Sequence, residues 1–193
     1  MKNIVLFIAA VLIALGTYAQ DKPQGLNVND VAPQFTAKDQ NGKEVNLKKL
    51  GKSGPVVMLF YRGQWCPFCN KQLSEMQDSI SLIAAKGAMV VAITPEKPEN
   101  IKKTIEKTKA SYSVLFDDGL KIMKDYKVAF AVEASVIEKY KSYGIDFATA
   151  NGNNGANLPV PAVYIIKEGK IIYRYFDADY KKRPSVKEIL THL

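Results

Sequence analysis

The stretch VVMLFYRGQWCPFCNKQL, residues 56–73, passes from an apolar run to two cysteines and then to a segment of mixed polarity. The apolar run is typical of a strand that is buried on both faces of a sheet. Pro67 suits the first turn of a helix, where its missing N–H leaves no hydrogen bond unmade. The stretch therefore predicts a strand, a short loop and a helix, with Cys66 and Cys69 at the start of that helix.

The helix is expected to continue to Gly87, because apolar residues recur at spacings of four and three along it. These residues are Cys69, Leu73, Met76, Ile80 and Ile83. The run AMVVAIT, residues 88–94, then predicts a second buried strand. The segment after the cysteines thus predicts a strand–helix–strand unit.

The alternation of helical and strand patterns continues to the end of the chain. The expected elements are an N-terminal hairpin at Asn41-Gly42, a helix at 99–109, a strand at 113–116, helices at 120–126 and 131–143, a hairpin at 160–176 that turns at Glu168-Gly169, and a final helix capped by Ser185. Residues 151–157, rich in Gly and Asn, are expected to form a mobile loop, either a flap over the site or a plain connection. The pattern predicts an α/β fold, a three-layer α/β/α sandwich around a central mixed sheet, as one domain over residues 20–193.

The first residues have the three parts of a secretory signal peptide. Lys2 supplies the positive start, residues 4–15 are apolar, and residues 17–19 form a small-x-small cleavage site. The apolar run is shorter than the roughly 20 residues that span a bilayer, although an uncleaved anchor is the alternative. We therefore expect residues 1–19 to be removed and the protein to be exported, periplasmic or secreted, without stable membrane insertion.

Composition excludes several classes of function. The net charge is +8, but the basic residues are interleaved with acids and form no aromatic-lined stripe, so nucleic acid is not an expected partner. Two cysteines and the single His192, expected at the surface, are too few to hold zinc. No metal, nucleotide or flavin cofactor is indicated, and the oligomeric state is left open.

The cysteine pair itself predicts redox chemistry. A disulfide between Cys66 and Cys69 closes so short a loop that it constrains the unfolded chain very little, which argues against a purely structural role. Helix N-termini stabilise thiolates. We expect Cys66 to be the more exposed sulfur and Cys69 the more buried one, with one attacking the substrate and the other resolving the product into a disulfide.

The chain resembles known families in two ways. WCPFC at a strand–helix junction, followed by VPAVYIIKEGKIIYRY at residues 160–175, resembles the thioredoxin fold, which implies a cis-proline at Pro161, after Val160, facing the cysteines. The wider pattern is similar to peroxiredoxin-like members of the AhpC/TSA (alkyl hydroperoxide reductase and thiol-specific antioxidant) family. The segments that carry it are APQFTAKDQNGKEVNLKKL, VVMLFYRGQWCPFCNKQL, VVAITPE, VLFDDGLKIMKDY and DADYKKRP.

The chain departs from both patterns. The proline, threonine and attacking cysteine of ordinary peroxiredoxins fall on Arg62, Cys66 and Cys69, and Pro161 stands where those proteins place an arginine. The buried acid of thioredoxins falls on Phe60. The resemblance thus implies a thioredoxin-like domain more firmly than it implies one reaction.

Two chemistries follow from the resemblance, of which reduction of peroxides is the expected one and disulfide exchange the alternative, and a third hypothesis lacks turnover. In a peroxidase, Cys69 attacks the peroxide, Cys66 resolves, a thioredoxin-like donor resets the pair, and Arg62 replaces the missing cation or is plain surface. In disulfide exchange, Cys66 attacks a protein disulfide, and Val160 and Pro161 line the groove that receives it. A redox-inert binding module is the third hypothesis.

The remaining residues near the cysteines have simpler interpretations. Trp65 and Phe68 are expected to pack beside the helix start, with substrate contact as the alternative. The charged turn at 179–183 is given no catalytic role.

Overall fold

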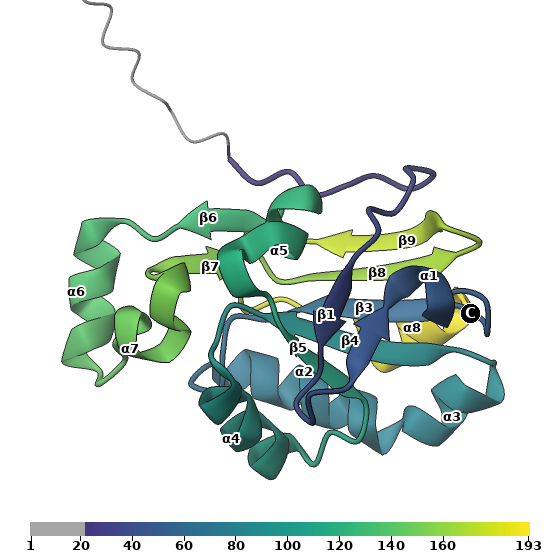
Figure 1. The fold of residues 1–193 in the computed structure, drawn as a ribbon, viewed down its shortest axis with the longest axis horizontal. Coiled ribbons are helices and arrows are strands. Elements are labelled where there is room, and N and C mark those ends of the chain that lie inside the picture. Colours follow the sequence, from purple (N-terminus) through teal and green to yellow (C-terminus); the bar gives the residue numbers. More distant parts are fainter. Residues whose placement is uncertain (1–21) are drawn as a thin grey trace, which may run out of the picture.

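The computed structural model describes residues 22–193, and Figure 1 shows their fold. The strands are β1 Thr36–Lys38, β2 Glu44–Asn46, β3 Val56–Phe60, β4 Met89–Thr94, β5 Ser113–Phe116, β6 Ala129–Ala131, β7 Asn157–Pro159, β8 Ala162–Lys167 and β9 Lys170–Phe176. The α-helices are α1 Leu47–Leu50, α2 Pro67–Asp78, α3 Ile80–Ala85, α4 Pro98–Thr108, α5 Lys121–Asp125, α6 Ala134–Ser142, α7 Phe147–Asn151 and α8 Val186–Thr191. Two 3-10 turns, η1 Asp118–Leu120 and η2 Gly152–Asn154, complete the set.

A mixed five-stranded sheet in the order β5-β4-β3-β8-β9 forms the centre of the fold. The pairs β3–β4 and β4–β5 are parallel, whereas β3–β8 and β8–β9 are antiparallel. Every residue of β3 is buried, as its continuous apolar run predicts. The carboxyl ends of β3 and β4 lie side by side, so the segments that follow them meet at one edge of the sheet.

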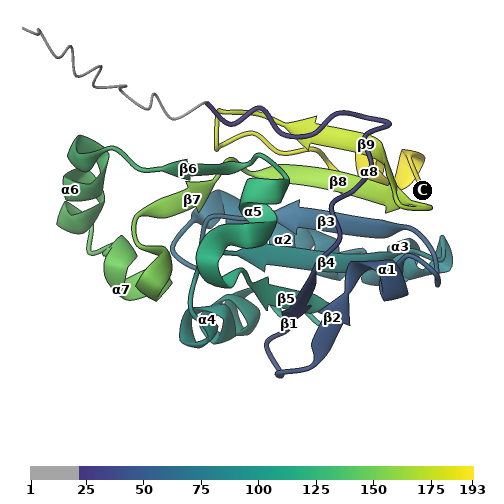
Figure 2. The same cartoon turned by 45° about the horizontal axis from the view of Figure 1, so that its top comes forward.

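Each face of the sheet is covered by a separate apolar layer, so the predicted three-layer architecture is confirmed (Figure 2). One face packs against the N-terminal hairpin β1–β2, α1 and α5, through residues such as Val45, Leu47 and Met123. The other face packs against α2, α4 and α8, through residues such as Leu73 and Ile101. Alternate residues of β3 point to opposite layers, which explains why a strand with no polar residue belongs in this position.

The helix that carries the cysteines is shorter than predicted. The predicted continuous helix to Gly87 is wrong, because the chain leaves helical geometry at Ser79 (φ −104°, ψ 9°) and restarts as α3. Asp78 and Ser79 are poor helix formers that favour helix ends, and apolar periodicity alone does not register such a break.

The predicted mobile loop at 151–157 is also wrong. This segment contains the end of α7, all of η2 and the start of β7, and the side chains of Asn151 and Asn154 are buried. Asn154 donates to the backbone oxygens of Pro95 and Asp117 and accepts from Gly119 N–H. Because the amides satisfy backbone groups from other elements, the Asn-rich composition here reflects internal hydrogen bonding rather than a solvated loop.

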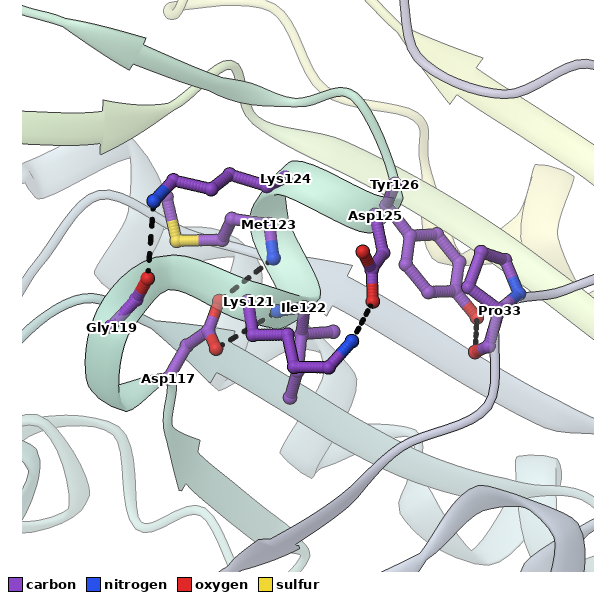
Figure 3. Close-up of polar contacts among 9 residues, drawn as sticks. All are labelled: Pro33, Asp117, Gly119, Lys121, Ile122, Met123, Lys124, Asp125 and Tyr126. Atoms are coloured by element: carbon purple, nitrogen blue, oxygen red, sulfur yellow. Dashed lines mark hydrogen bonds and ion pairs between the residues drawn. The ribbon is translucent and has the colours of Figure 1, made fainter.

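The segment after β5 is fixed by one buried carboxylate (Figure 3). Both oxygens of Asp117 accept backbone N–H groups of α5, from Ile122 at 3.0 Å and from Met123 at 2.7 Å. At the end of α5, Tyr126 donates its hydroxyl to the backbone oxygen of Pro33 at 3.1 Å. These bonds fasten α5 to the sheet edge and to the N-terminal segment.

The two ends of the described chain agree with most predictions from local sequence. The hairpin at Asn41-Gly42 and the turn at Glu168-Gly169 are present, with positive φ at Gly42, Glu168 and Gly169. Ser185 caps α8 by accepting from Glu188 N–H. The predicted signal peptide at 1–19 lies outside the described residues. Within residues 22–193, no helix combines the length and apolar character needed to cross a membrane.

Candidate redox-active site

The cysteine pair lies at the start of α2, where the loop after β3 turns into the helix. Cys66 is the N-cap residue, and its sulfur accepts the backbone N–H of Cys69 at 3.4 Å. Both side chains are free thiols and both are buried, with Cys66 1% and Cys69 0% exposed. Cys66 is thus the more exposed sulfur, as expected, but only by a small margin, because both side chains belong to the core layer on one face of the sheet.

Arg183 contacts the sulfur of Cys69 directly, with Nη2 at 3.3 Å from Sγ. Its other donors are also occupied: Nε donates to Gln72 Oε1 at 2.9 Å, and Nη1 donates to the backbone oxygens of Tyr180 and Lys182. The guanidinium is thus held in one orientation with its charge against the thiol. The turn at 179–183, which the sequence analysis gave no catalytic role, thus places one side chain in contact with the site, and only the family's tail motif offered a signal for it.

The pKa values of the two thiols are shifted in opposite directions. Burial by itself would raise the pKa of the Cys69 thiol, but the hydrogen bond from Cys66, the charge of Arg183 and the Arg62 backbone N–H lower that pKa to about 6. The pKa of Cys66 is raised far above its ordinary value, because its thiol donates to Cys69 and is buried. At neutral pH, the pair is therefore a Cys69 thiolate beside a Cys66 thiol.

Arg62 is neither surface nor the cation that contacts Cys69. Its side chain is 5% exposed, its guanidinium lies 4.4 Å from the ring centre of Tyr180, 4.9 Å from that of Trp65 and 5.4 Å from that of Tyr140, and Nη2 donates to Tyr140 Oη. Cation–π attraction to three rings holds it between the cysteine loop and α6. The charge of Arg62 favours the ionised form of Cys66, and its backbone N–H lowers the pKa of Cys69 by hydrogen bonding to the thiolate.

The two aromatic residues beside the cysteines pack as predicted. Trp65 meets the rings of Tyr140 and Phe147 at centroid distances of 5.3 and 5.5 Å. Phe68 meets the ring of Tyr180 at 6.0 Å. Helices α6 and α7, which form one end of the molecule in Figure 1, thereby cover the cysteine loop.

Val160 and Pro161 line a cavity of about 540 Å³ together with Arg62, Phe130 and Tyr180. Arg62 links this cavity to the cysteine loop, so these predicted site residues lie near the pair. The predicted cis bond before Pro161 is wrong, since the described residues contain no cis peptide bond. The trans form is the preferred state of X–Pro bonds, and here Val160 N–H donates to the backbone oxygen of Val128.

A buried acid also lies near the pair, but it does not come from the strand before the cysteines. Phe60 occupies the position of the thioredoxin acid and is fully buried in the core. The acid is Glu96, which follows β4 and accepts the backbone N–H of Gln64 at 2.7 Å. Sequence reasoning missed Glu96, although VVAITPE places it directly after a strand parallel to β3.

His192 lies far along the chain from the pair, is exposed and packs on the ring of Tyr173. Residues 22–193 contain no cluster of three or more His, Cys, Asp or Glu side chains arranged to hold a metal ion.

Comparison with known proteins finds a matching family and sequence relatives. A sequence model of the AhpC/TSA family matches residues 28–174. A chloroplastic peroxiredoxin Q of Gentiana triflora is 39% identical over 98 residues, which cover 51% of this chain and 45% of that protein. The chain thus spans about half the length of the curated relatives it matches.

Solved structures with the same fold come from two kinds of protein. A peroxidoxin of Mycobacterium tuberculosis superposes with a TM-score of 0.67 at 20% identity, over 86% of this chain and 96% of that one. The thioredoxin domain of a thiol-disulfide oxidoreductase from Bacteroides vulgatus superposes with a TM-score of 0.55 at 20% identity, over 81% and 93% of the two chains. These similarities establish a thioredoxin-type fold.

Proposed function

The chain belongs to the AhpC/TSA family, and from that premise we propose that it is a thiol peroxidase that reduces hydroperoxides by cycling Cys66 and Cys69 between dithiol and disulfide. The observation that carries the proposal is the hydrogen bond from the guanidinium of Arg183 to the sulfur of Cys69. The charge of Arg183 helps to lower the pKa of Cys69, and the thiolate is the form that attacks peroxides.

We infer separate roles for the two sulfurs. Cys69 thiolate attacks one peroxide oxygen, the O–O bond breaks, and Cys69 becomes a sulfenic acid. Arg183 is in place to stabilise the negative charge as it moves from the sulfur to the leaving oxygen. Cys66, one helical turn away, then attacks the sulfenic sulfur, which forms the disulfide and releases water.

Burial of both sulfurs favours a small oxidant. A hydroperoxide needs only its terminal oxygen to reach Cys69 Sγ, whereas a protein disulfide must lay a chain segment against the attacking sulfur. Attack on a protein disulfide needs an accessible sulfur, and Cys66 is only 1% exposed. Thiol-disulfide exchange remains the second candidate because Val160 and Pro161 line a cavity beside the cysteine loop.

Stopped-flow mixing of the reduced protein with hydrogen peroxide tests the proposal. Trp65 is the single tryptophan and adjoins Cys66, so its fluorescence reports disulfide formation without a label. We expect oxidation far faster than that of a free thiol at the same pH. Oxidation at the free-thiol rate, combined with rapid reaction toward a disulfide substrate, would replace the peroxidase with a disulfide reductase.

Two serine variants assign the sulfurs in the same assay. Cys69→Ser is expected to lose the reaction with peroxide, whereas Cys66→Ser is expected to react and stop at the sulfenic acid, which a sulfenate-specific reagent traps. The opposite result would make Cys66 the attacking sulfur. A double serine variant that keeps a binding partner, in a chain with no turnover, would indicate a redox-inert binding module.

The partner and the location belong to the same proposal. We infer that a thioredoxin-like protein reduces the disulfide, and that the chain is exported to the periplasm or secreted after removal of residues 1–19. N-terminal sequencing of the protein from its natural source tests the second point. An intact Met1 on the folded protein would contradict signal cleavage.

A further inference from the structure

Glu96 is a buried carboxyl group that the proposed mechanism leaves without a role. Its side chain is 0% exposed and contacts the loop that leads to Cys66. Oε2 accepts the backbone N–H of Gln64 at 2.7 Å, whereas Oε1 has no hydrogen-bond partner among the described residues. Burying a charged carboxylate with one unbonded oxygen costs desolvation free energy, which favours the protonated form of Glu96.

The free oxygen of Glu96 faces the backbone just before the cysteines. A Cβ on Gly63 would lie 2.6 Å from Glu96 Oε1 and 2.5 Å from Trp65 Nε1, so only glycine fits there. Trp65 Nε1 is also buried without a partner among the described residues. The carboxyl group therefore packs directly against the loop that positions Cys66.

The groups that face Glu96 come from three elements. Lys103 and Lys107 approach from α4, Cys69 from α2, and the buried Tyr61 from the end of β3. Burial raises the pKa of Glu96 to about 8; the Gln64 N–H and the two lysines oppose this effect, and the negative charge of Cys69 adds to it. The proton on Glu96 is thus coupled to the charge on Cys69.

We propose that Glu96 stores the proton that oxidation of the cysteine pair consumes. When Cys69 thiolate attacks a hydroperoxide, the leaving oxygen needs a proton to become an alcohol or water. Cys66 keeps its own proton until the disulfide forms, when that proton leaves with the departing hydroxide as water. Loss of the Cys69 charge removes the repulsion that adds to the effect of burial, so oxidation lowers the pKa of Glu96 and favours release of its proton.

The proposed step balances in atoms, protons and electrons. One thiolate, one thiol, one carboxylic acid and one hydroperoxide become one disulfide, one alcohol, one water and one carboxylate. The two sulfurs supply the two electrons that cleave the O–O bond. A disulfide oxidant gives the same balance, since its two product thiols take the protons of Cys66 and Glu96. The inference therefore depends on the redox pair and not on the nature of the oxidant.

Proton uptake during oxidation tests the inference. Reduced protein in weak buffer with a pH-indicator dye is oxidised by hydrogen peroxide at pH values on either side of about 8 and above the Cys69 pKa. The wild type is expected to take up less than one proton per disulfide below about pH 8 and one proton per disulfide above that pH. Glu96→Gln, which keeps an acceptor for Gln64 N–H, is expected to take up one proton throughout.

Asp117→Asn is the matched control, because Asp117 is also a buried carboxyl but both of its oxygens are bonded to α5. It is expected to follow the wild type. Equal uptake by wild type and Glu96→Gln below pH 8 would overturn the inference.

Infrared difference spectra provide a second readout on the wild type alone, in case Glu96→Gln does not fold. Oxidation should remove the C=O stretch of a protonated carboxyl group, and an unchanged band would overturn the inference. Repeating both measurements with oxidised dithiothreitol separates the two proposals. If that reagent gives the pH-dependent uptake while peroxide fails to react, the peroxidase proposal fails and the role of Glu96 stands.

Discussion

Two segments bring ionisable side chains to the cysteine pair, one a cation and the other an acid, and the two side chains are bonded differently. The turn before α8 brings Arg183, whose side chain makes four hydrogen bonds, one of them to Cys69. The segment after β4 brings Glu96, which has one bonded oxygen and one free oxygen. A cation that is bonded through all three of its nitrogens sets a constant field at the thiolate, whereas a buried acid with one unbonded oxygen is able to change its protonation.

Removing the cation tests the first half of this comparison and should have the largest effect. Arg183→Gln is expected to raise the pKa of Cys69 and to slow oxidation by peroxide at neutral pH by roughly 10- to 100-fold. The reason is that a hydrogen bond to a charged group contributes about 1.5–3 kcal/mol. Stopped-flow oxidation and the ultraviolet absorbance of the thiolate provide the two measurements.

Lys182→Gln is the control for Arg183→Gln, since it removes an exposed cation from the same turn that pairs with Asp177 instead of Cys69. It should react at the wild-type rate. If both variants behave alike, the contact between Arg183 and Cys69 is not what makes Cys69 reactive.

The pH dependence of stability compares the two groups directly. The pKa of Cys69 is lowered on folding to about 6 from about 8.5, so its contribution to stability is complete above about 8.5 and is lost as pH falls through 6. The pKa of Glu96 is raised to about 8 from about 4.3, so its contribution is complete below about 4.3 and is lost as pH rises through 8. Between about pH 6 and 8 the two contributions have opposite slopes.

Each group should therefore be separable by mutation. Relative to the wild type, the free energy of unfolding of Cys69→Ser should decline by up to about 1.4 kcal/mol more per pH unit in this window, and by less where loss of the Cys69 charge also lowers the pKa of Glu96. That of Glu96→Gln should rise by about the same amount per pH unit. Urea unfolding of the reduced proteins across the window measures both slopes. Parallel curves for all three proteins would show that neither group changes its protonation on folding.

Much of the fold is readable from the sequence because its determinants are local. Each signal lies within a few positions of the element that it determines. These signals are the continuous apolar run of β3, Pro67 at the start of α2, and the turn residues Gly42 and Gly169. The cysteine pair is readable for the same reason.

The parts that were missed depend on contacts across the chain. Arg183 lies 114 positions from Cys69, and no local pattern distinguishes it from the neighbouring Lys182. Tyr140 and Phe147 pack on Trp65 from segments more than 70 positions away, a contact that sequence periodicity does not report. Glu96 is close to the pair only because β4 runs parallel to β3.

Loosening the cation without removing its charge should have a moderate effect. Gln72→Leu removes the acceptor for Arg183 Nε but keeps the guanidinium, so peroxide oxidation is expected to slow by several fold, equivalent to about 0.5–1.5 kcal/mol. Gln77→Leu on the same helix is the matched control, because Gln77 bonds to Ser111 and not to Arg183. Equal rates for both variants would mean that Gln72 does not position Arg183.

The smallest effect is expected for Arg62, the second arginine near the cysteine pair. Replacing it tests whether a nearby positive charge without a contact to Cys69 also lowers the pKa of Cys69. Arg62→Met removes a charge that is nearly buried and whose Nε and Nη1 have no partners among the described residues. The lost contacts with Tyr140 and the rings are offset by the desolvation that the charge no longer requires, so stability should change by less than about 1 kcal/mol.

The thiolate titration of Arg62→Met should keep its midpoint near pH 6, because the Arg62 backbone N–H that serves Cys69 is retained in the variant. A midpoint as high as that of Arg183→Gln would instead show that total positive charge near the pair, rather than one bonded guanidinium, makes Cys69 a thiolate.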